Sequence, residues 1–147
     1  MVTPHLVRIS YASALCDELG PGELGALLSI WRRRNAERGV TGLLLHHTGS
    51  VFHVIEGFPE VVVRLYDAIA ADPRHRQVAK LTEEATSHRG FGDWSLGHAR
   101  VTATELGALP ELRPILDPAF RYWRCDAVMA EALIAAFTTG PFRRSIV

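Results

Sequence analysis

The 147-residue sequence lacks the features that mark several specialised classes of protein. Its two cysteines, Cys16 and Cys125, show neither CxxC nor Cys/His ligand spacing, so we expect two free thiols rather than a redox or metal motif. Basic and acidic residues both number 16, and this zero formal net charge argues against an electrostatic surface for nucleic acid. No apolar run reaches the roughly 18 residues that a membrane span needs, and no signal peptide opens the chain. We therefore expect a cytoplasmic protein with no membrane or direct nucleic-acid contact.

What is present is typical of one globular domain. Apolar residues make up 48% of the chain and charged residues 22%. A chain of this length can bury a core without disulfides. The one local basic run is Arg32–Arg34, which we interpret as the solvated face of a helix.

Two apolar runs, residues 40–45 and 51–57, are separated by a short polar loop that contains a glycine. This pattern predicts a β-hairpin. Both faces of the second run are mostly apolar, which favours a central strand covered on both sides. His53 lies in the middle of that strand, and an unsatisfied buried polar group costs about 1–3 kcal/mol. His53 therefore needs a partner.

The remaining elements complete the order β-α-β-β-α-β-β. The patterns predict strands over 6–13, 77–85 and 94–101, and amphipathic helices over 23–38 and 59–71. We interpret this order as a ferredoxin-like α+β fold: a five-stranded mixed sheet with the two helices on one face.

A C-terminal helical extension follows. Three prolines break up its first part, and a helical stripe that includes Val128 then runs over residues 125–138. We expect this last helix to cover the sheet face that the first two helices leave bare.

Three polar residues stand where apolar ones are expected: Tyr11 in the first strand, Asn35 on the inner stripe of the first helix, and His53. The predicted topology places the first and third strands side by side, with the first helix above them. Convergence of a few polar groups in an apolar pocket is typical of a small-molecule site. A satisfied core network from Tyr11 through His53 to Asn35, with no ligand, explains the same pattern equally well.

Other chemistries are less favoured. His46 and His47 are adjacent on a strand and so point to opposite faces, which disfavours a metal site. No set of nucleophile, base and electrophile can be assembled, so we do not expect an enzyme. An acylphosphatase-like site would want an arginine in the loop over 14–22, and there is none.

Five ordered motifs resemble the BLUF domain, the FAD-based sensor of blue light. Together they span roughly residues 5–100. The five motifs are residues 6–13, which include Tyr11; residues 34–36 leading to 40–44; and residues 52–57, 72–75 and 91–95. The resemblance implies a BLUF-like flavin-binding domain over 1–103, with the extension over 104–147 packed on it as in short single-domain members.

The resemblance also implies a set of cofactor-binding residues. Asn35 would hydrogen-bond the polar edge of the flavin ring, and Arg74 and His75 match the motif near the ribityl chain and phosphate. Tyr11 matches the tyrosine that gives an electron and a proton to the excited flavin. Trp94 matches a tryptophan of the late strand.

The sequence departs from the family at the site itself. The family has a glutamine where this chain has His53, and that glutamine bridges the tyrosine and the flavin. Leu96 stands where a methionine is common. A neutral imidazole has one donor and one acceptor, so it can bridge, but it does not rotate or tautomerise as an amide does.

Two functions remain open from these residues. One is a FAD-binding photoreceptor that signals through contacts with a protein partner, its photocycle altered or lost because of His53. The other is a light-insensitive interaction or regulatory module, with or without flavin. We also expect a homo-oligomer.

Overall fold

The structure is a computed structural model that describes residues 5–15, 21–99 and 101–147. Cys16, expected in a loop, lies outside the described residues. The elements, in chain order, are β1 (Leu6–Leu15), α1 (Pro21–Arg38), β2 (Thr41–His47), β3 (Ser50–Gly57), α2 (Pro59–Ala71), β4 (His75–Thr86), β5 (Gly97–His98), α3 (Ala103–Gly107), the 3₁₀ turns Pro110–Leu116 and Tyr122–Arg124, α4 (Ala127–Thr138) and a last 3₁₀ turn, Arg143–Ser145. In the described part of the chain, no helix is both long and apolar enough to span a membrane.

The five strands form one mixed sheet in the order β4-β1-β3-β2-β5. Neighbouring strands are antiparallel except for β5, which runs parallel to β2. The predicted ferredoxin-like fold with a five-stranded mixed sheet is confirmed.

The last strand is much shorter than expected. The sequence predicted a strand over 94–101, but only Gly97–His98 pairs with β2. The backbone turns before this point, and on the other side His98 exchanges backbone hydrogen bonds with Val147. A bridge between Ala99 and Ile146 continues that contact. The C-terminal residues therefore cover the edge that a longer strand would have extended.

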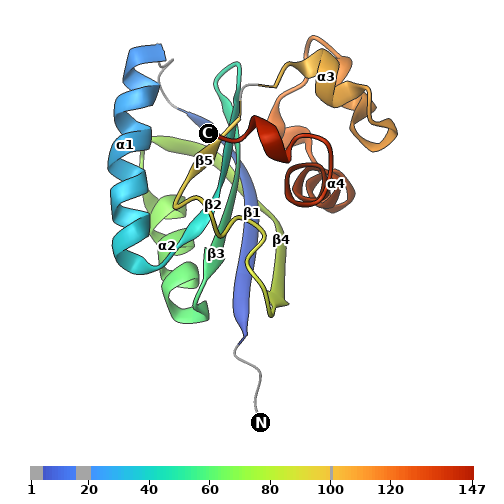
Figure 1. The fold of residues 1–147 in the computed structure, drawn as a ribbon. Coiled ribbons are helices and arrows are strands. Elements are labelled where there is room, and N and C mark those ends of the chain that lie inside the picture. The colour runs from blue at the N-terminus through green and yellow to red at the C-terminus, as the bar shows by residue number, and fades with distance from the viewer. Residues whose placement is uncertain (1–4, 16–20, 100) are drawn as a thin grey trace.

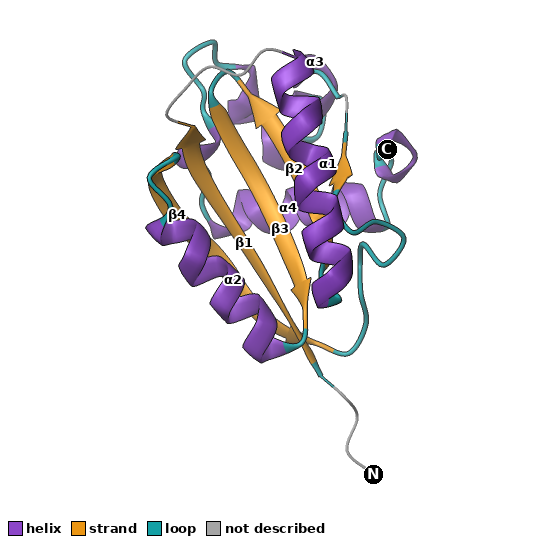
Figure 2. Ribbon diagram, turned by 90° about the vertical axis from the view of Figure 1, so that its left-hand side faces the viewer, coloured by secondary structure: helices purple, strands orange, loops and turns teal. Residues whose placement is uncertain are grey.

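Two layers of helix cover the two faces of the sheet (Figures 1 and 2). The predicted helices α1 and α2 lie together on one face, and α4 lies on the other. On the α4 face, Phe52 and Val54 of β3 share one core cluster with Leu133 and Phe137 of α4. The expectation that the late helix covers the bare sheet face is confirmed, whereas Val128, placed on its inner stripe, is 66% exposed.

The end of α1 is fixed by a glycine. Gly39 has φ 68°, its N–H bonds the Ala36 carbonyl, and the N–H of Val40 bonds the Asn35 carbonyl. A positive φ is readily adopted by glycine, so Gly39 ends the helix in a left-handed turn, directly after the predicted end of the helix at residue 38. This turn holds the last two turns of α1 in place over the sheet.

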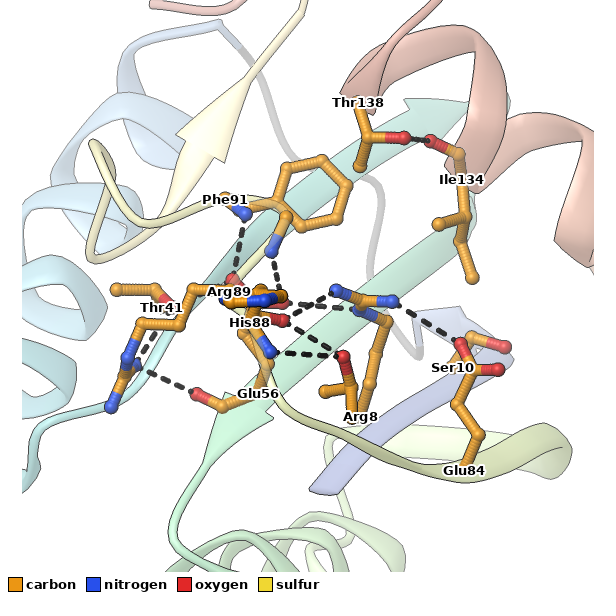
Figure 3. Close-up of polar contacts among 12 residues, drawn as sticks. Arg8, Ser10, Thr41, Glu56, Glu84, His88, Arg89, Phe91, Ile134 and Thr138 are labelled. Carbon is orange, nitrogen blue, oxygen red and sulfur yellow. Dashed lines mark hydrogen bonds and ion pairs between the residues drawn. The ribbon is translucent and has the colours of Figure 1, made fainter. Parts of the chain in front are cut away.

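On the α4 face, the buried carboxylate of Glu56 ties the segment after β4 to the sheet (Figure 3). It accepts hydrogen bonds from Arg8 Nε, the Thr41 hydroxyl, and the backbone N–H groups of Gly90 and Phe91 at 2.7–3.0 Å. Four donors, one of them charged, offset the cost of burying this charge. The sequence analysis did not predict these partners of Glu56.

Candidate functional site

A cleft with a cavity volume of about 190 Å³ lies between α1 and α2, above the sheet. This is several times the roughly 30 Å³ of one water molecule. Apolar side chains form most of its wall: Leu24, Trp31, Leu44, Val51, Leu65 and Ile69. The polar and charged residues that line it are Tyr11, Arg34, Asn35, Arg38, His53, Asp72, Arg74 and His75. An apolar hollow with a few polar groups is the usual form of a cofactor site.

Tyr11 and His53 form the floor of the cleft. They are directly opposite each other in the β1–β3 ladder, so both side chains lie on the same face of the sheet. The Tyr11 hydroxyl lies 2.5 Å from His53 Nδ1. Tyr11 is 1% exposed and His53 is 7% exposed. The structure brings together the two residues that the sequence singled out.

Both side chains of this pair are neutral at physiological pH. Burial, with a smaller effect from Tyr66, raises the pKa of Tyr11 above its ordinary value. Burial, with a smaller effect from His75, lowers the pKa of His53 to about 3. The bond between them therefore joins a phenol and a neutral imidazole.

The second ring nitrogen of His53 has no partner within residues 5–15, 21–99 and 101–147. Nε2 is buried and makes no hydrogen bond to any residue that the structure describes. A neutral imidazole has one N–H donor and one acceptor nitrogen, so Nε2 takes whichever role Nδ1 does not. Leaving it unpaired costs about 1–3 kcal/mol. His53 thus brings to the lining of the cleft a buried polar atom whose hydrogen-bonding capacity is unused.

Asn35 lies on the α1 side of the same cleft. It is buried, and its Nδ2 donates to the Ser95 carbonyl at 2.8 Å. This bond connects α1 to the segment before β5. The network from Tyr11 through His53 to Asn35, considered from the sequence, does not close among the described residues, because His53 Nε2 has no hydrogen-bond partner there.

Arg74 and His75 line the end of the cleft near the start of β4. Arg74 donates through Nε and a terminal nitrogen to the Asp72 carboxylate, and these bonds lower the pKa of Asp72 to about 2. His75 Nδ1 lies 3.0 Å from the Ser13 hydroxyl, and burial lowers the pKa of its imidazole.

A β-bulge lets β4 begin at His75, two residues earlier than the sequence predicted. The pairing with β1 shifts register where Gln77, with φ 53°, sits opposite Ser13. Bulges often re-aim side chains beside functional sites. Only the structure reveals this one, because nothing in the local sequence signals it.

Trp94 is the predicted site residue that the structure does not bring to the cleft. It packs against the core cluster of the α4 face, with the Arg143 guanidinium carbon 5.0 Å from its ring centroid. The physical reason is the short β5: Trp94 precedes the paired residues and lies in the irregular segment that leads to them.

Arg34 and Arg38 also line the cleft, and the sequence analysis missed them. The available signal was their position: Trp31, Arg34, Asn35 and Arg38 are spaced three, four and seven residues apart, which places them on one face of a helix. Because Arg34 belongs to a run of three arginines, the whole run was interpreted as solvated.

Comparisons with known proteins agree with this architecture. The family model described as BLUF, sensors of blue-light using FAD, matches residues 6–97. The photoactivated adenylate cyclase subunit beta of Euglena gracilis is 28% identical over 143 residues, which cover 96% of this chain and 16% of that protein. The blue light- and temperature-regulated antirepressor BluF of Escherichia coli (strain K12) is 34% identical over 87 residues, which cover 59% of this chain and 22% of that protein. The chain thus spans less than a quarter of either relative.

Solved structures show the same fold. The ground state of BlsA matches with a TM-score of 0.76 and 22% identity, covering 93% of this chain and 90% of that one. The dark state of BlrB, a BLUF protein, matches with a TM-score of 0.66 and 27% identity, and the match covers 92% of this chain and 99% of that one.

Proposed function

The chain belongs to the BLUF family, sensors of blue light using FAD, and we propose that it is a FAD-binding photoreceptor domain that signals through contacts with a partner protein. The family description is that of a sensor and not of a catalyst. The observation that carries the proposal is the unpaired, buried Nε2 of His53 in the floor of an apolar cleft.

The cleft fits a flavin. Its apolar walls suit a flat aromatic ring, and Asn35 and His53 present polar groups to the polar edge of such a ring. FAD supplies the absorption of blue light and an excited state that accepts an electron. In this proposal Tyr11 donates that electron, and the proton that follows moves between side chains of this chain.

The proton of Tyr11 has one short route. Its hydroxyl bonds His53 Nδ1, and a neutral imidazole with an acceptor Nδ1 takes this proton directly. In that tautomer Nε2 carries a hydrogen and donates into the cleft. Burial disfavours the resulting imidazolium strongly, since it lowers the pKa of His53, so the proton returns to Tyr11 once Tyr11 has regained its electron.

The resemblance places a glutamine where this chain has His53. A carboxamide exchanges its donor and acceptor ends by rotating, whereas an imidazole at a fixed ring position exchanges them only by gaining a proton at one ring nitrogen and losing one at the other. We therefore propose that the family-type photocycle is altered or lost here. This substitution also favours the second candidate function, a light-insensitive BLUF-like regulatory module.

A signalling route out of the cleft needs an element with two states. Asn35 bonds the Ser95 carbonyl, and Arg32, on the same helix, donates through Nε to the Leu96 carbonyl at 2.7 Å. These two bonds fasten α1 to the segment that leads into β5. We propose this segment and the C-terminal residues paired with it as the part that transmits a change at the cleft.

The domain organisation belongs to the same proposal. We propose that residues 1–103 and 104–147 act as one domain, because side chains of the sheet and of α4 share one core cluster. A homo-oligomer is also part of the proposal, and light scattering of the purified protein tests it.

The test of the flavin site is the absorption spectrum of the purified protein, with the bound cofactor identified after denaturation. Visible flavin absorption and released FAD support the photoreceptor proposal. A colourless protein that does not take up added FAD contradicts it and supports the module without flavin.

A further inference from the structure

The three arginines of the basic run have three different environments. Arg32 donates to the carbonyls of Leu96 and Val147. Arg33 is exposed and is not among the residues of the cleft. Arg34 lines the cleft, and Arg38, four residues later, lines it too. The run is therefore not a uniform solvated face.

Among the charged groups of the cleft, these two arginines are the uncompensated ones. Arg74 forms an ion pair with Asp72 at 2.7 Å and bonds it through two nitrogens, so this pair adds no net charge. Neither Arg34 nor Arg38 forms an ion pair with any residue in the described part of the chain. The opening of the cleft consequently carries two surplus positive charges in a protein whose formal net charge is zero.

The two guanidinium groups share one side of the opening. Residues four apart on a helix lie one above the other, so Arg34 and Arg38 project from adjacent turns of α1. Each offers a planar fork of N–H donors, a geometry that matches phosphate oxygens. Asn35, between them in sequence, reaches deeper and is buried, which places the arginines nearer the solvent than the polar floor.

We propose that Arg34 and Arg38 form a phosphate subsite that makes the cleft prefer phosphorylated flavins over riboflavin. This inference rests on the proposed flavin site. It differs from the assignment that the resemblance implies, because it gives the phosphate charge to α1 and leaves Arg74 with Asp72. Exposed charge pairs contribute about 0.2–1 kcal/mol each, so two of them correspond to a preference of roughly two- to thirtyfold.

The experiment compares FMN with riboflavin, which share the same ring and ribityl chain and differ by one phosphate. Protein loaded with each flavin is diluted, and the dissociation constant is obtained from the fluorescence of the released flavin. We expect wild type to bind FMN and FAD more tightly than riboflavin at low salt. Added salt should reduce this preference, because it screens exposed charges.

The variant Arg34→Gln/Arg38→Gln should bind FMN and riboflavin equally, with riboflavin affinity within twofold of wild type. Arg33→Gln is the matched control on the same helix and should keep the preference. The variant Asp72→Asn/Arg74→Gln, which removes both charges of that ion pair, should keep most of the preference. Inorganic phosphate as a competitor should weaken FMN binding and leave riboflavin binding unchanged.

The inference is overturned if wild type binds FMN and riboflavin equally, or if Arg34→Gln/Arg38→Gln keeps the preference, or if Asp72→Asn/Arg74→Gln removes it. Failure of the proposed flavin site looks different: wild type then binds none of the three flavins. Because riboflavin binding reports the ring site and the ratio of FMN to riboflavin reports the phosphate subsite, the two outcomes are distinguished.

Discussion

The hydroxyl of Tyr11 and the Nδ1 atom of His53 lie 2.5 Å apart, across the two central strands of the sheet. Both side chains are buried, and the other ring nitrogen of His53 has no partner within the described residues. One end of the imidazole is thus committed to the tyrosine and the other is left for a ligand. This single arrangement determines how the proton of Tyr11 can move.

Acid stability should depend on His53. Its pKa in the folded protein is about 3, below the ordinary value of 6.5, so the unfolded chain binds more protons between these pH values. The stability that the neutral imidazole contributes is therefore fully present above pH 6.5. It falls as the pH drops from 6.5 towards 3, by up to about 1.4 kcal/mol per pH unit. His53→Gln should flatten this dependence in urea unfolding between about pH 4 and pH 6.

Other histidines with lowered pKa, such as His75, remain in both proteins and cancel in this comparison. Equal slopes of the free energy of unfolding against pH in wild type and His53→Gln would contradict a buried, neutral His53.

Asn35→Leu should reduce flavin occupancy. A polar edge that loses its partner in a dry site costs about 1–3 kcal/mol, which corresponds to roughly 5- to 150-fold in affinity. Occupancy is measured from the ratio of visible to ultraviolet absorbance. Ala36→Leu, at an exposed position of the same helix, is the control. Unchanged flavin affinity in Asn35→Leu, with the fold intact by circular dichroism, would count against this cleft.

Glu56→Gln should destabilise the fold by about 2–4 kcal/mol, because an amide cannot accept all four hydrogen bonds and would remove the buried one of the two carboxylates that pair with Arg8. Glu84→Gln is the matched control, since Glu84 pairs with the same arginine at an exposed position, and it should cost less than about 1 kcal/mol. Urea unfolding measures both. Equal effects would show that the buried network does not hold the segment after β4.

The sequence predicted the fold because its strongest signals are local. The stripe of α1, the left-handed turn at Gly39 and the two-faced apolar run over 51–57 each depend on a few neighbouring residues. What it missed depends on contacts between distant segments: the four donors on Glu56 and the bulge at Gln77.

The candidate site was predicted in part for the same reason. Tyr11, Asn35 and His53 stood out as polar residues on apolar faces. Trp94 was expected in a strand over 94–101, but only Gly97–His98 pairs with β2, and the C-terminal residues pair with the other side of β5. Arg34 was missed because a run of like charges conceals that only some of its members face a cleft.

His53→Gln should restore a photocycle of the family type, provided that Tyr11 and Asn35 keep their places. The amide can accept from the Tyr11 hydroxyl and then reverse its two ends, which the imidazole does not do. Tyr11→Phe in the His53→Gln background should abolish the photocycle again, since it removes the donor of the electron and the proton. Light-induced absorbance changes measure both steps. A restored signal that survives Tyr11→Phe would exclude Tyr11 as that donor.

The difference spectrum of the flavin-bound wild type, recorded before and after blue light, tests the central claim most directly. The claim is that His53, held by Tyr11 at Nδ1, has no equivalent of the rotation by which an amide exchanges its two ends. We therefore expect no reversible red shift of the family type in wild type, although Tyr11 still quenches the excited flavin because electron transfer needs only proximity. A normal reversible red shift in wild type would show that a histidine performs the role of the glutamine, and would contradict this account of the switch.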